Sequence, residues 1–149
     1  MNIPFLSFGF HEQIREKLLE ASIRVIDSGW FVNGEEVSAF QNEWADYLAC
    51  GHTVGTSNGL DALILSLKAL GIGAGDEVIV PSNTYVATAL AATHVGATPV
   101  FVEPKIETYN IDPRRIEAAI TNKTKAIMPV HLYGQAAEMT AIMEIAERH

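Results

Sequence analysis

The sequence predicts an α/β protein in which helices cover both faces of a parallel sheet and two further helices come first. Short apolar segments alternate with helical ones, and strands are predicted at residues 52–56, 77–81, 98–102 and 126–130. These segments show no regular polar alternation, which is typical of parallel strands buried on both faces. Helices between such strands form right-handed crossovers.

Two amphipathic helices are predicted ahead of the sheet. In residues 12–28 apolar side chains recur every three or four positions, and Gly29 ends the pattern. Residues 35–50 carry a second apolar face. The intervening Trp30 and Phe31 are expected to pack in a core, which is the commoner place for large aromatic side chains. If they are exposed, they would indicate an interface or a substrate edge.

The later helices are predicted to begin near Asn58, Thr84 and Asp112, with a last one over residues 136–149. The start at Asp112 is the clearest of them. Aspartate caps a helix well, and the proline that follows it suits the first helical position.

Composition limits the classes of function. The 149 residues are 48% hydrophobic and 19% charged, which indicates one globular domain with a core. The net charge of −8, with scattered basic residues, argues against nucleic acid or an anionic membrane as a partner. Cys50, the one cysteine, is expected to be a small buried residue and fits a reducing cytoplasm. Neither a signal peptide nor a membrane-spanning run is recognisable.

The junction at residues 55–63 is the strongest functional signal. It reads GTSNGLDAL, with a predicted strand before it and an apolar helix after it. Ser57 or Asn58 can cap the helix, and Gly59 allows a ligand to approach the backbone. The free N–H groups and the helix dipole favour a phosphate there. An ordinary capped helix is the alternative interpretation.

Ligands of parallel sheets bind at the carboxyl ends of the strands. Small and polar residues follow each predicted strand, and Tyr85 is a flat aromatic side chain among them. A phosphate on the helix after residue 58 and a ring against Tyr85 would together describe an aromatic phosphorylated cofactor.

Other motifs carry less weight. The glycines of residues 71–75 follow a helix instead of a strand, so they predict a turn and not a dinucleotide loop. His94 and His131 have no suitably spaced partners, so no metal site is expected. Residues 55–59 match the glycine spacing around a hydrolase serine, which leaves Ser57 as a weak hydrolase alternative.

Taken together, these stretches resemble the N-terminal portion of the DegT-type (DegT/DnrJ) sugar aminotransferases. The matching segments are PFL (4–6), SGWFVNGEEV (28–37), GTSNGLDAL (55–63), GDEVIVP (75–81), TYVAT (84–88), GATPVF (96–101) and KAIMPVHLYG (125–134). The resemblance implies the fold-type I (aspartate aminotransferase-like) large domain, the cofactor pyridoxal 5'-phosphate (PLP) and a homodimer. It further implies that Ser57, Asn58 and Gly59 hold the cofactor phosphate through backbone N–H groups, and that Tyr85 stacks on its ring.

The implied reaction is transfer of an amino group from glutamate, or another amino acid donor, to a nucleotide-linked keto sugar. In the family, the lysine that carries the cofactor and the acid beside its ring nitrogen come later than His149. Residues 1–149 are therefore expected to be an inactive fragment of the large domain, with no catalytic residue. A PLP-dependent sugar dehydratase of the same family, with histidine for that lysine, and a noncatalytic phosphate-binding module remain alternatives.

The resemblance also places the strand predicted at residues 52–56 at a sheet edge, separated from the other three by strands that come later in the family. In this fragment we expect an exposed hydrophobic gap, a rearranged sheet or pairing with another chain.

Overall fold

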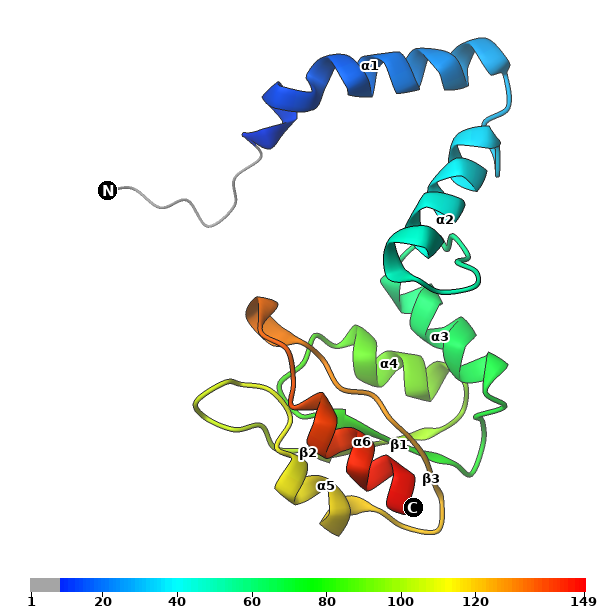
Figure 1. Ribbon diagram of the computed structural model, residues 1–149. Helices are drawn as coiled ribbons and strands as arrows, with labels where there is room; N and C mark the ends of the chain where they lie inside the picture. Colours follow the sequence, from blue (N-terminus) through cyan, green and yellow to red (C-terminus); the bar gives the residue numbers. More distant parts are fainter. Residues whose placement is uncertain (1–8) are drawn as a thin grey trace. The chain divides into compact units, whose positions relative to one another are not determined.

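The computed structural model describes residues 9–149, which divide into two compact units at Gly55 (Figure 1). The first unit contains α1 (Phe10–Ser28) and α2 (Glu35–Leu48). The second contains the sheet and the remaining helices. The PFL stretch at residues 4–6 lies outside the described residues.

The two predicted N-terminal helices are confirmed. Gly29 ends α1 in the left-handed conformation, with φ of 65°, and its N–H donates to the Ile26 carbonyl at 3.2 Å. Two expectations for this unit are wrong. The side chains of Trp30 and Phe31 are exposed, and so is Cys50.

The sheet is parallel and has the strand order β2-β1-β3. The positions of β1 (Glu77–Pro81) and β2 (Thr98–Val102) confirm the prediction. The third strand does not occupy residues 126–130, because β3 is Thr124–Ile127. Its ladder with β1 ends where the Met128 N–H donates to the Ile79 carbonyl at 2.8 Å. The next N–H of β1 that would face β3 belongs to residue 81, which is a proline and cannot donate to the Met128 carbonyl.

The strand predicted at residues 52–56 is wrong for this structure. These residues have no regular structure, and none of the strands at residues 9–149 pairs with them. Gln41 of α2 bonds to them instead: its backbone carbonyl accepts from the Thr53 hydroxyl, and its side-chain oxygen accepts from the Gly55 N–H at 2.7 Å. Val54 in this segment is 80% exposed.

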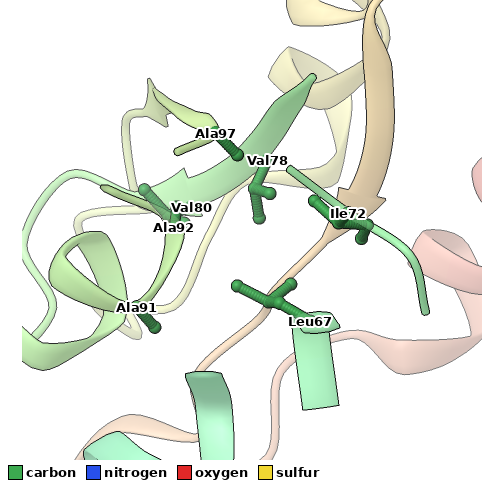
Figure 2. Packing of buried hydrophobic residues seen from close by; sticks show 7 residues of the cluster. All are labelled: Leu67, Ile72, Val78, Val80, Ala91, Ala92 and Ala97. Carbon is green, nitrogen blue, oxygen red and sulfur yellow. The ribbon is translucent and has the colours of Figure 1, made fainter. Parts of the chain in front are cut away.

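Helices cover both faces of the sheet, as predicted. Val78 and Val80 of the central strand pack with Leu67, Ala91 and Ala92, which belong to α3 (Gly59–Ala69) and α4 (Ala87–His94) (Figure 2). Because side chains alternate along a strand, Ile79 points to the opposite face. There it packs with residues of α5 (Pro113–Ala119) and α6 (Met139–Arg148), including Ile116, Ile142 and Ile145.

The helices with a capping side chain, α3 and α5, begin where the sequence predicts. Asn58 caps α3 and Asp112 caps α5, as predicted. The helix expected near Thr84 begins at Ala87, and the one expected from residue 136 begins at Met139. Thr84 precedes α4 in a turn where its hydroxyl bonds to the Thr88 hydroxyl at 2.9 Å. Within residues 9–149, each helix is too short or too polar to cross a membrane.

Candidate functional site

A hollow of about 660 Å³ lies at the carboxyl edge of the sheet in the second unit. Three segments line it: the start of α3, the loop from β1 into α4, and the chain that follows β3. Its lining residues are Asn58, Gly59, Leu60, Leu63, Thr84, Tyr85, Val86, Ala87, Thr88, Leu90, Val130 and Leu132. The structure therefore brings three of the four predicted site residues, Asn58, Gly59 and Tyr85, to one cavity.

The first turn of α3 supplies unpaired N–H groups to this hollow. Asn58 is extended, with φ of −162° and ψ of 174°, and its side-chain oxygen accepts from the Asp61 N–H at 2.9 Å. Its carbonyl accepts from the Ala62 N–H at 3.1 Å. The amides of Asn58, Gly59 and Leu60 have no acceptor within residues 9–149, as expected for a helix start. They offer an anion three adjacent donors.

Ser57 lies differently from the other predicted residues, since it is not among those that line the hollow. Its hydroxyl donates to the Asp61 carboxylate. The Asn58 side-chain amide donates to the same carboxylate at 3.0 Å and to the Ser57 oxygen at 3.2 Å. Both side chains are thus turned towards Asp61, so recognition of an anion here depends on the backbone.

Asp61 is a site residue that the sequence reasoning missed. The spacing from Asn58 to Asp61 is that of a capping box, in which the fourth residue bonds back towards the cap. This signal was present in the sequence. The Asp61 carboxylate holds the cap together, and it also places a negative charge at the helix start.

Tyr85 forms another part of the wall of the hollow and is 78% exposed. It follows the central strand β1 and directly precedes the first turn of α4. The surrounding lining is mostly aliphatic and includes Leu60 of α3 and Val86 and Leu90 at and in α4. An exposed phenol ring beside aliphatic side chains suits a flat, partly apolar ligand.

Two other kinds of site gain no support. A hydrolase elbow requires a strand immediately before its serine, and residues 52–56 form none. Among residues 9–149, no cluster of His, Cys, Asp and Glu side chains is arranged to hold a metal. Lys105, which follows β2 at this edge of the sheet, is paired with Glu138, and its side chain is 21% exposed.

Comparison with known proteins supports this interpretation. The sequence profile of the DegT/DnrJ/EryC1/StrS aminotransferase family matches residues 12–149. A dTDP-3-amino-3,6-dideoxy-alpha-D-galactopyranose transaminase from Aneurinibacillus thermoaerophilus is 51% identical over 148 residues, which are 99% of this chain and 41% of the relative. The chain thus spans about two fifths of that relative's length.

Solved structures agree with the sequence comparison. DesV from S. venezuelae superposes with a TM-score of 0.95 at 49% identity, over 99% of this chain and 40% of that one. The PLP form of the sugar aminotransferase Spr1654 from Streptococcus pneumoniae gives a TM-score of 0.87 at 34% identity, over 99% of this chain and 37% of that one. The expected resemblance and fold-type I architecture are confirmed. The chain belongs to the DegT/DnrJ/EryC1/StrS aminotransferase family.

Proposed function

We propose that this chain forms the N-terminal portion of the cofactor-binding large domain of a PLP-dependent transaminase. Its substrates would be a nucleotide-linked keto sugar and an amino acid donor such as glutamate. The observation that carries the proposal is the single hollow that is lined by Asn58, Gly59 and Tyr85. It combines an anion seat with an aromatic wall, and these are the two features that a phosphorylated pyridine requires.

The residues present fit the cofactor. The amides of Asn58, Gly59 and Leu60 are unpaired within residues 9–149 and stand at the positive end of the α3 dipole, which favours a phosphate dianion. A Cβ added to Gly59 would meet nothing within 4 Å, so the backbone there is open to a ligand. Family members solved in PLP and PMP forms make this group the natural occupant.

Each wall of the hollow has a distinct task in this proposal. The start of α3 binds the phosphate, and Tyr85 orients the ring and excludes water from one of its faces. Leu60, Val86 and Leu132 supply an apolar surround that strengthens polar interactions inside it. When bound, PLP supplies an electron sink for moving the amino group between the two substrates.

The remaining chemistry would come from chain beyond these residues. In the family, the lysine that attaches the cofactor and the acid beside the ring nitrogen follow later, and a second subunit of a homodimer completes the site. Residues 1–149 alone would therefore bind and orient without catalysing. Ser57 would support the phosphate seat only indirectly, through its bond to Asp61.

The test is titration of the complete protein with pyridoxal 5'-phosphate, followed by visible absorption and by dialysis against buffer. We expect a retained chromophore, and amino transfer from glutamate to a panel of dTDP- and UDP-linked keto sugars. Retained cofactor without amino transfer to any keto sugar would contradict the proposed reaction. Failure to retain the cofactor at all would contradict the proposed site.

A further inference from the structure

A buried asparagine fastens the chain that follows β3. Asn110 is 3% exposed, and both ends of its side-chain amide are used. Its oxygen accepts from the Leu132 N–H at 3.0 Å, and its nitrogen donates to the Gln135 carbonyl at 3.0 Å. Leu132 is the first residue of the short 3-10 turn η1 (Leu132–Gly134), and Gln135 follows its last residue. Leu132 itself lines the candidate hollow.

The turn held by Asn110 is strained. Tyr133 has φ of 55° and Tyr109, beside Asn110, has φ of 59°. Left-handed backbone at a residue with a bulky side chain is uncommon and persists where the surroundings hold it. The two tyrosine rings meet edge to face, with centroids 5.9 Å apart. The hydrogen bonds of Asn110 on both sides of Tyr133 act on η1 together with the Gln135 N–H to Leu132 carbonyl bond at 3.0 Å and the Ala137 N–H to His131 Nδ1 bond at 3.0 Å.

The same loop is tied to the opposite wall of the hollow. The Asn83 side-chain nitrogen donates to the Tyr109 carbonyl at 3.0 Å. Asn83 directly precedes Thr84 and Tyr85, which line the hollow. The segment Tyr109–Asn110 therefore connects the Tyr85 wall with the Leu132 wall, although neither of its residues lines the cavity.

We propose that Asn110 is a positioning residue for the candidate site. By holding Leu132 in place relative to Tyr85, it sets the spacing between two walls of the hollow, so that a flat ring fits between them. The anion seat at Asn58 and Gly59 is on a separate element, α3, and is bonded independently of Asn110. The identity of the ring as that of PLP rests on the function proposed above.

The experiment uses the complete protein with Asn110→Ala. Amide hydrogen exchange at Gln135, whose N–H donates to the Leu132 carbonyl at 3.0 Å and not to Asn110, reports whether η1 keeps its conformation. Equilibrium titrations with PLP and with inorganic phosphate report the two parts of the site. Asn110→Asp keeps an oxygen that can accept from the Leu132 N–H. Asn122→Ala is the matched control, because Asn122 is exposed on the loop that enters the opposite, amino end of β3.

With Asn110→Ala we expect at least tenfold faster exchange at Gln135 and about tenfold weaker PLP binding, with inorganic phosphate affinity within twofold of wild type. Asn110→Asp should recover only part of the protection of Gln135, because it keeps the acceptor for the Leu132 N–H but places an oxygen against the Gln135 carbonyl. Asn122→Ala should match wild type. Equal losses for PLP and phosphate would indicate general loosening and overturn the proposal, as would unchanged PLP affinity once Gln135 is deprotected. If the wild type binds no PLP, the proposed function fails; Gln135 exchange in Asn110→Ala then decides the positioning role, and unchanged exchange rejects it.

Discussion

Replacing Gly59 with proline would delete one proposed phosphate donor and leave the fold intact. Gly59 is the first residue of α3, and proline suits that position because the N–H there has no helical partner. The residue before a proline must be extended, and Asn58 already is, with φ of −162° and ψ of 174°. A Cβ at position 59 has no neighbour within 4 Å. The backbone therefore accommodates the substitution.

The expected loss can be worked from one hydrogen bond. A bond from a backbone N–H to a charged group contributes about 1.5–3 kcal/mol, so removing it should weaken PLP binding by about 10- to 100-fold. The free energy of unfolding should change by less than about 1 kcal/mol, since proline also restricts the unfolded chain. Equilibrium titration of the complete protein with PLP measures the first quantity, and denaturant unfolding of the cofactor-free protein measures the second.

Gly59→Ala is the matched control because alanine keeps the N–H and fits the same open space. We expect it to bind PLP as wild type does and to unfold at equal or slightly higher denaturant concentration. If Gly59→Pro folds normally and still binds PLP with wild-type affinity, the backbone of α3 is not the phosphate seat.

Three further substitutions test separate parts of the structure. Tyr85→Ala should weaken PLP binding by up to about tenfold through loss of about 1 kcal/mol of ring stacking, whereas Tyr85→Phe should bind PLP as wild type does. If Tyr85→Ala and wild type have equal PLP affinities in a titration, stacking is ruled out. Leu67→Ala should lower the free energy of unfolding by about 3 kcal/mol because it opens a cavity in the core, measured by denaturant. The hydrogen bond and charge of Arg114 hold the pKa of Asp112 below its usual range. Asparagine caps a helix as well as aspartate does, so Asp112→Asn should lose only the charge pairing with the largely exposed Arg114, which is up to about 1 kcal/mol near neutral pH. In urea unfolding across pH, this difference should shrink below about pH 4 as the carboxylate is protonated, and a pH-independent difference would contradict it.

Much of the fold was predictable because local signals and tertiary packing agree. The central strand Glu77–Pro81 and its neighbour Thr98–Val102 are apolar runs bounded by turn residues. The first is buried from Val78 to Pro81, whereas in the second only Val102 is buried and Phe101 is 57% exposed. The caps at Asn58 and Asp112 were predictable because a side-chain oxygen just before a helix accepts a hydrogen bond from a free N–H of its first turn.

The errors come from interactions that a local pattern does not contain. Residues 52–56 have the composition of a strand, but a strand forms only where another strand offers it hydrogen bonds. Gln41 of α2 bonds to this segment instead. β3 ends at Ile127 although the apolar run continues to Val130, because Pro81 of β1 has no N–H to donate to the Met128 carbonyl.

The candidate site was only partly predictable. Asn58, Gly59 and Tyr85 follow from where helices and strands end, so the sequence suffices to bring them to one hollow. Asn110 lies in a loop and acts through contacts to residues 132 and 135, which are more than twenty positions away. No periodicity or local motif reports such a contact. The contact of Asp61 with the cap could have been predicted from its position three residues after Asn58.

The hydrogen bonds of Asp61 to Ser57 and Asn58 determine what mutagenesis of this turn can report. The Ser57 and Asn58 side chains both donate to the Asp61 carboxylate. An anion would therefore bind to backbone N–H groups, which every residue except proline has. An alanine scan across residues 56–61 would register changes in helix integrity and report little about the ligand. Substitutions that keep the helix start intact and leave the N–H groups in place should therefore preserve this anion site.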